Sequence, residues 1–530
     1  MKPWIAVIIL ATCSAVSVVT GQERAERLGQ VHFPTSCTPA AQQQFDRALA
    51  MLHNFMYPQD LNAFREVAKT DPSCAIAYWG IAISRRTNPL VGPPDSAVLK
   101  EGLAAVNQAT VIGAKTQRER DYIAAIASYY RDPDKRDYGA RVLAYEQAME
   151  QAYHRYPEDA EAAIFYALAL DEAVTVLPPD KNYTRQLKAG AILEKVLAAQ
   201  PDHPGALHYV IHSYDFPPLA ERGLAAARRY GAVAPAAAHA LHMPSHVYSM
   251  LGMWQASVEA NRAALSVVKG YVHAMDFMVY AYLQGAQDRE AKQLVDASVA
   301  LQANQAPPSA LNPSGAVLAG YTAFAAIPAR YAIERGAWAE AAALQPRPTT
   351  PAADAITHFA RAMGAARSGD LPSARMSIDQ LRQLRDALAQ AKLDYWAEQV
   401  EIERSAAAAW VASAEGKKDD ALRLMRSAAD LEDGSEKHVA MENRLWPMRE
   451  LLGELLLGMN EPAPALKEFE RSLQAARNRY RGFYGAAKAA ERSGDRQTAR
   501  AFYEKLVALC SHADTERPEL AEAKTYLAQN

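Results

Sequence analysis

ALHYVIHSY (residues 206–214) is followed by ALHMPSHVY (residues 240–248) and AMDFMVYAY (residues 274–282), each 34 residues after the segment before it. Alanine opens and tyrosine closes every segment, so the three keep one register. A fixed period of about 34 residues is typical of helix–turn–helix repeats that stack side by side into a solenoid. We therefore expect an all-α fold in which equivalent positions of the segments lie at similar heights on neighbouring helices.

The same period occurs outside these segments. Pro201 and Pro235 are 34 residues apart, and so are Ala465 and Ala499 near the other end of the chain. Runs of about a dozen Ala-, Leu- and Glu-rich residues alternate with short breaks that contain Pro, Gly or Asp. The chain is therefore predicted to form one continuous right-handed array of antiparallel helical hairpins from about residue 38 to the C-terminus, without a sheet.

The N-terminus has the features of a secretory signal. MKPWIAVIILATCSAVSVVTG has one lysine, then an apolar run that ends in small residues. We expect export to the periplasm or the medium, and no lipid attachment through Cys13, because threonine before that cysteine is unusual in a lipoprotein signal. The predicted domains are a signal peptide at 1–21, a lead-in at 22–37, an N-terminal repeat array with a histidine-rich groove at 38–300, proline-rich connections and degenerate hairpins at 301–351, and a C-terminal array at 352–530.

Composition excludes several classes of function. The 57 basic and 60 acidic residues give a net charge of −3, and no basic stripe with interleaved aromatic residues occurs, which excludes a nucleic-acid partner. No later run approaches the ~20 apolar residues that cross a bilayer, so no membrane span is expected after signal removal. The motifs of serine hydrolases, phosphate-binding loops, zinc proteases and dinucleotide-binding folds are absent.

Two cysteines are candidates for a disulfide. Cys37 precedes the first helical hairpin and Cys74 follows it, so both lie at the same end of that hairpin. Disulfides form in exported proteins, which agrees with the signal segment. Two buried free thiols are the alternative.

Metal-binding side chain types occupy repeated positions in the three segments. Histidines four residues apart share one face of a helix, and packed helix axes lie ~8–10 Å apart, so imidazoles of adjacent helices can meet at one ion. We expect one site between three consecutive helices, which would hold Zn, Cu or Fe. The predicted metal ligands are His208, His212, His239, His242, His246 and Asp276, and the further groove contributors are His273, Tyr280 and Asp215.

Two other interpretations of these histidines remain open. The groove could be metal-free and bind an acidic or aromatic ligand through its imidazoles, or the histidines could be ordinary core residues. A single histidine usually belongs to the core, but five in one repeat phase seldom do. His203 is interpreted as a helix-start or turn residue, and His53 as an isolated structural or exposed one.

The chain resembles the tetratricopeptide repeat (TPR) superfamily throughout its predicted mature region. It also resembles a group of exported bacterial TPR proteins, without a firm biochemical role, that carry FPTSC (residues 33–37), PDHPGALHYVIHSYD (residues 201–215) and HALHMPSHVY (residues 239–248). The resemblance implies a groove lined by the second, fifth and ninth residues of each first helix, and every repeated histidine falls on such a position. Pro244 departs from the TPR pattern and is expected to kink its helix.

A TPR groove implies a function in binding a protein or peptide ligand. The sequence therefore predicts an exported interaction module with a histidine-rich metal site. The alternative is a metal-dependent hydrolase or oxidoreductase built on the same solenoid.

Overall fold

Helices make up nearly all of the regular structure. The computed structural model describes residues 27–304, 316–347, 349–438 and 444–529, and these ranges contain no β-strand. The first half of the array contains α2 (Pro39–His53), α3 (Tyr57–Thr70), α4 (Ala75–Ser84), the short 3₁₀ helix η1 (Pro89–Val91), α5 (Ser96–Ile112), α6 (Gln117–Tyr130), α7 (Tyr138–Arg155), α8 (Ala160–Val174), α9 (Thr184–Ala199), α10 (Pro204–Ser213), α11 (Ala220–Val233), α12 (Ala238–His242), α13 (Pro244–Met250), α14 (Trp254–Val267), α15 (Val272–Gln284) and α16 (Asp288–Gln302).

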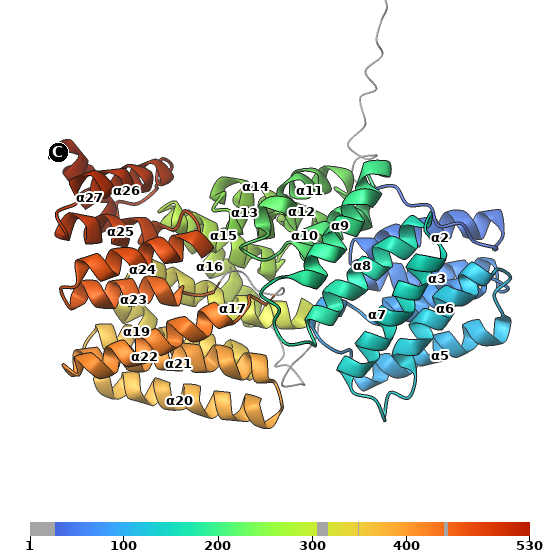
Figure 1. The fold of residues 1–530 in the computed structure, drawn as a ribbon, viewed down its shortest axis with the longest axis horizontal. Coiled ribbons are helices and arrows are strands. Elements are labelled where there is room, and N and C mark those ends of the chain that lie inside the picture. The colour runs from blue at the N-terminus through green and yellow to red at the C-terminus, as the bar shows by residue number, and fades with distance from the viewer. Residues whose placement is uncertain (1–26, 305–315, 348, 439–443, 530) are drawn as a thin grey trace, which may run out of the picture.

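The second half continues in the same way (Figure 1). It contains α17 (Ala316–Glu334), α18 (Trp338–Ala342), α19 (Pro351–Arg367), α20 (Leu371–Gln390), α21 (Asp394–Ala414), α22 (Lys418–Gly434), α23 (Met448–Gly458), α24 (Pro462–Ala475), α25 (Tyr480–Arg492), α26 (Arg496–Leu509) and α27 (Pro518–Gln529). Among the described residues, no helix is both long and apolar enough to cross a membrane.

Successive helices pair into antiparallel hairpins that stack in chain order. The first helix of a hairpin packs on its partner and also on the first helix of the next hairpin, as α8 does on α10, α13 on α15 and α15 on α17. In Figure 1 the stack runs from the blue N-terminal helices at one end to the red C-terminal helices at the other. The fold is a TPR-like right-handed α-solenoid, which confirms the predicted fold class.

Small residues set the spacing between the helices. Gly190 of α9 faces the ring of Tyr214, and a Cβ at this glycine would lie 2.3 Å from that ring. Gly485 of α25 accepts Phe469 of α24 in the same way. A large ring that packs against a glycine, which has no side chain, lets two helices approach closely. Tyr214, which closes the first repeated segment, therefore acts as a packing residue.

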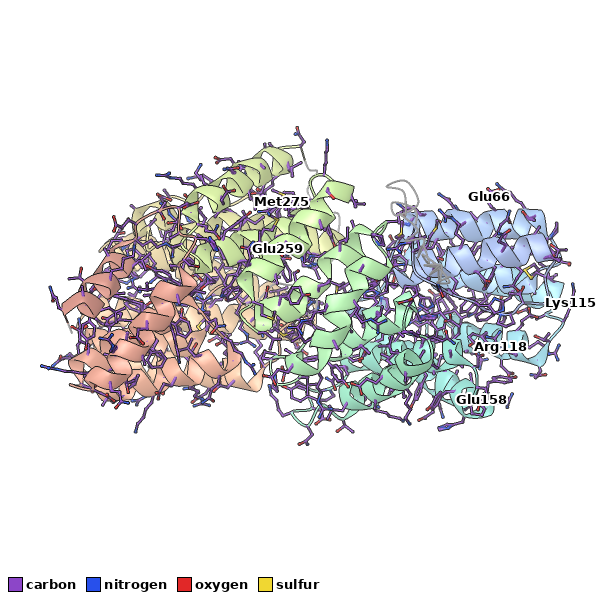
Figure 2. The ribbon with its side chains drawn as sticks, turned by 90° about the horizontal axis from the view of Figure 1, so that it is seen from above. Glu66, Lys115, Arg118, Glu158, Glu259 and Met275 are labelled. Carbon is purple, nitrogen blue, oxygen red and sulfur yellow. A yellow bond between two sulfur atoms is a disulfide. The ribbon has the colours of Figure 1, made fainter. Side chains whose placement is uncertain are left out.

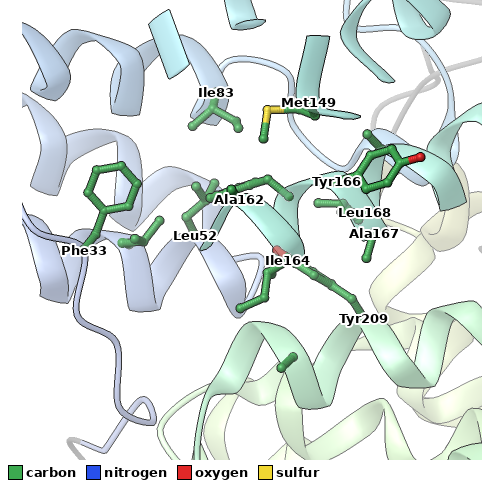
Figure 3. Close-up of a cluster of buried hydrophobic side chains, with 14 of the residues drawn as sticks. Phe33, Leu52, Ile83, Met149, Ala162, Ile164, Tyr166, Ala167, Leu168 and Tyr209 are labelled. Carbon is green, nitrogen blue, oxygen red and sulfur yellow. The ribbon is translucent and has the colours of Figure 1, made fainter. Parts of the chain in front are cut away.

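A large apolar core occupies the N-terminal part of the array (Figure 3). Ala162, Ile164 and Leu168 of α8 lie in this core together with Leu52 of α2 and Tyr209 of α10. The solenoid curves so strongly here that α2 packs directly on α10. The end of α2 is thereby placed against the helix that carries the first histidine pair.

Two local features predicted from the sequence are present in the structure. Cys37 and Cys74 form a disulfide, with their Cα atoms 5.0 Å apart. The helix with the second histidine pair is broken at the proline, because α12 ends at His242 and α13 begins at Pro244. The predicted signal peptide lies outside the described residues.

Candidate metal centre

Six histidines gather where α10, α12, α13 and α15 pack side by side. They form two groups, and in each group one ligand atom per residue lies within 4.8 Å of the others. We call His208, His212 and His239 the first triad, and His242, His246 and His273 the second triad. Met275, labelled in Figure 2, marks the place of α15 in the middle of the array.

The first triad converges through Nε2 atoms. Nε2 of His208 lies 3.0 Å from Nε2 of His212 and 3.0 Å from Nε2 of His239. Nδ1 of His208 donates to the backbone carbonyl of His53 at 2.6 Å. A carbonyl oxygen only accepts hydrogen bonds, so Nδ1 carries the proton of His208 and its Nε2 presents a lone pair.

The second triad is built in the same way. Nε2 of His242 lies 3.1 Å from Nε2 of His246. Nδ1 of His242 donates to Oδ1 of Asn261 at 2.6 Å, and Nδ1 of His246 donates to Oδ2 of Asp215 at 2.9 Å. The ring of His273 completes the group, with its centroid 4.7 Å from that of His242.

The tautomer of His242 is set by its outer partner. Nδ2 of Asn261 donates to the carbonyl of Ser257 at 2.8 Å, which leaves Oδ1 as the atom that faces His242. Nδ1 of His242 is therefore the donor, and its Nε2 lone pair points at the lone pair of His246. Metal-bound histidines in proteins have this arrangement, in which an amide, carbonyl or carboxylate holds the distal N–H.

Burial keeps the six imidazoles neutral. It lowers the pKa of His242 to about 4, and burial together with the neighbouring imidazoles lowers the pKa of His208, His239 and His273 well below the ordinary value. A protonated His246 would supply a hydrogen for the 3.1 Å contact with His242, but burial lowers the pKa of His246 well below its ordinary range too. Two neutral lone pairs at this distance repel each other, and a shared cation removes that repulsion.

Asp215 is shared between the second triad and a distant segment. Nζ of Lys437 lies 3.2 Å from Oδ1 of Asp215, and both side chains are buried. Burial raises the pKa of Asp215, while Lys437 and His212 act in the opposite direction. Asp215, predicted as a groove contributor, therefore holds His246 from outside the triad, and Lys437 offsets its charge.

One phenylalanine packs against each triad. The ring centroid of Phe55 lies 4.4, 5.9 and 5.3 Å from those of His208, His212 and His239. Phe277 packs on the second triad, with centroids 4.8, 4.7 and 5.1 Å from those of its three histidines. Each triad thus has an apolar ring against its three imidazoles, which excludes water on that side and strengthens electrostatic interactions there.

Tyr271 lies at the junction of the two triads. Its hydroxyl is 3.4 Å from Nδ1 of His239, and its ring centroid is 5.4 Å from that of His242. Tyr271 and His239 are half-buried, whereas the other five histidines are buried. Solvent therefore comes closest to the histidines beside Tyr271.

Two predicted site residues are engaged elsewhere. Asp276 is buried and accepts from Nε of Arg330 at 3.1 Å, and Tyr280 accepts from Arg479. Neither belongs to a triad. His273 is in the second triad instead, so the ligand atoms in both triads are imidazole nitrogens.

A third buried group is already satisfied by hydrogen bonds. Nε2 of His53 and Nε2 of His203 each lie 2.9 Å from a different carboxylate oxygen of Glu161. Nδ1 of His203 accepts from the backbone of Ala206, so its Nε2 donates to Glu161. His203 is the N-cap of α10, in agreement with its predicted place at a helix start. The network also holds His53, whose backbone carbonyl accepts a hydrogen bond from Nδ1 of His208.

His53, predicted to be an isolated structural or exposed residue, is buried and bonded to the cluster. Its carbonyl lies 155 positions before His208 in the chain and meets it only because α2 returns to α10. No motif spacing signals such a contact. The tertiary curvature of the solenoid is what creates it.

The site and the fold together define a class: a helical-repeat solenoid with two three-histidine groups in its middle. No family model matches the chain, and the search of curated proteins found no match. Among solved structures, Naa15/Naa10 bound to HypK-THB is similar over 92% of this chain and 73% of that chain, at 13% identity and a TM-score of 0.25. A human IFIT1 dimer with m7Gppp-AAAA is similar over 82% of this chain and 90% of that chain, at 13% identity and a TM-score of 0.39.

Proposed function

We propose that this protein is an exported metal-binding protein whose solenoid holds transition-metal ions between its histidine triads. The observation that carries the proposal is the 3.1 Å contact between Nε2 of His242 and Nε2 of His246, whose Nδ1 atoms are held by Asn261 and Asp215. With metal–nitrogen bonds of ~2.0–2.1 Å, two ligands of a tetrahedral ion lie ~3.3 Å apart. The free nitrogens therefore lie close to the spacing of a metal's coordination shell.

The disulfide supports the exported part of the proposal. Cys37 and Cys74 are bonded, and disulfides persist mainly in oxidising compartments such as the periplasm. The N-terminal segment predicted as a signal peptide agrees with that location.

A helical-repeat array is also a surface for binding proteins or peptides. The histidines on the predicted groove positions are buried, apart from half-buried His239, so a peptide would contact other parts of the array.

A metal-dependent enzyme remains the alternative function, and the half-buried edge at Tyr271 is where a substrate would approach. A pull-down from periplasmic extract, with and without chelator, separates these roles, because a stable partner that chelator leaves bound favours the interaction module.

Elemental analysis tests the metal proposal. Protein without a histidine tag would be purified after growth with Zn, Cu and Fe supplied. We expect at least one transition-metal ion per chain, and its loss in His242→Ala and His246→Ala. His154→Ala is the matched control, since His154 is exposed on α7, and it should keep the wild-type content. Sub-stoichiometric metal in the wild type would reject the proposal.

A further inference from the structure

The two triads are separate and complete sets of ligands. Each contributes three imidazoles, and each has its own phenylalanine, Phe55 or Phe277, against all three rings. Within a triad one ligand atom of each histidine lies within 4.8 Å of the others, and the closest rings have centroids 4.7 Å apart. Between the triads the ring centroids lie 6.2 Å apart for His239 and His242 and 6.4 Å apart for His212 and His246. The ligand geometry therefore provides for two ions side by side.

The charge around the triads is balanced before any ion binds. Asp215, whose carboxylate bonds Nδ1 of His246, forms an ion pair with Lys437, whose Nζ lies 3.2 Å from Oδ1 of Asp215. Asp276, the other nearby carboxylate, is paired with Arg330. No carboxylate among the described residues belongs to either triad, so nothing in the ligand set neutralises the charge of a bound ion.

A ligand set without a carboxylate favours metal ions of low charge. The cost of burying an ion grows with the square of its charge, so a divalent ion costs about fourfold more than a monovalent one in the same shell. Two divalent ions would place four positive charges in a buried neutral shell, and two monovalent ions only two. Copper is the imidazole-binding metal that has a stable monovalent state, and three-coordination by nitrogen leaves no position that water must fill.

We propose that each triad binds one copper(I) ion, so that the chain holds a pair of cuprous ions. The inference deepens the proposed function and rests on it. His208, His212 and His239 hold one ion, and His242, His246 and His273 hold the other. Asn261 and Asp215 orient the rings of the second triad from outside the coordination shell.

The test is an anaerobic titration of metal-free protein with copper(I) presented as its bicinchoninate complex. We expect the wild type to withdraw two copper ions per chain, and His212→Asn and His273→Asn to withdraw one each. The double variant should withdraw none. His154→Asn, at the exposed position on α7, should still withdraw two.

A second measurement does not depend on the variants folding. Copper K-edge X-ray absorption of the loaded wild type should show cuprous ions with three nitrogen neighbours at ~2.0 Å and no sulfur. One copper per chain, or sulfur in the shell, would overturn the paired site. Binding of two zinc ions by a protein that leaves copper(I) on bicinchoninate would overturn the inference and keep the proposed function. Binding of neither metal would overturn both.

Discussion

The Nε2 atoms of His242 and His246 lie 3.1 Å apart although a helix break separates the two residues. The corresponding atoms of His208 and His212, on the unbroken helix α10, lie 3.0 Å apart. The break at Pro244 therefore leaves the four-residue pairing intact. In the first pair the ring of His208 is held through Nδ1 by the carbonyl of His53, and in the second pair both rings are held through Nδ1, by Asn261 and Asp215.

Asn261 should control the metal affinity of the second triad. Asn261→Ala removes the acceptor for Nδ1 of His242, which frees the ring and its tautomer. Loss of such an outer partner typically weakens metal binding ~10–100-fold. Competition titration against a chromogenic chelator measures this change. Asn261→Asp keeps an acceptor oxygen and should restore most of the affinity; equal weakening in both variants would show that the contact does not orient the ring.

Asp276 should matter for stability and not for metal binding. Asp276→Ala leaves the buried guanidinium of Arg330 without this partner, and breaking a buried ion pair typically costs ~3–5 kcal/mol. Denaturant unfolding should show that loss, while elemental analysis finds the wild-type metal content. Asp276→Asn, which keeps an acceptor for Arg330, should lose less stability. A drop in metal content in both variants would instead return Asp276 to the ligand set.

Asp171 should make stability fall as the pH rises. Its carboxyl is buried and bonded to the hydroxyl of Ser213 at 2.7 Å, and burial raises its pKa well above the ordinary value. The neutral form is therefore favoured in the folded state. Its contribution is fully present below the unfolded pKa of ~3.9 and is lost, at up to ~1.4 kcal/mol per pH unit, as the pH rises toward the folded pKa.

Asp171→Asn removes this dependence, because the amide stays neutral at every pH. The difference in melting temperature between the variant and the wild type should grow in favour of the variant from about pH 4 to 7. Asp379→Asn, at an exposed position, should show no such trend. A constant difference across the range would show that Asp171 does not change its ionisation on folding.

The disulfide should stabilise the N-terminal end of the array. Cys37 and Cys74 are 37 positions apart, and closing a loop of that length contributes up to ~4 kcal/mol on the chain-entropy argument. Reductant should lower the free energy of unfolding by an amount of that order in denaturant titrations. The variant Cys37→Ser/Cys74→Ser should start at the lower value and not respond to reductant.

The buried free thiol of Cys510 should remain unreactive toward alkylating agents until unfolding.

By itself, the sequence determined the helical repeat and the phase of the histidines. A 34-residue period forces equivalent side chains onto equivalent faces of stacked helices, so five of the six triad histidines could be predicted as members of one cluster, with His273 beside them. The irregularity of the helix at Pro244 and the place of His203 at a helix start or turn were also predictable, because the proline and the Asp-His-Pro sequence act on the backbone within one turn.

The tertiary structure alone decided how the cluster divides and what surrounds it. Asp276 shares the repeat phase of His208 and His242, but Arg330 on the next first helix takes its carboxylate, and no period encodes that pairing. The carbonyl of His53 and the ammonium of Lys437 reach the histidines only because the solenoid curves back on itself. Contacts between neighbouring repeats recur with the 34-residue period of the sequence. Contacts between repeats that are far apart in the chain depend on the curvature that the solenoid accumulates.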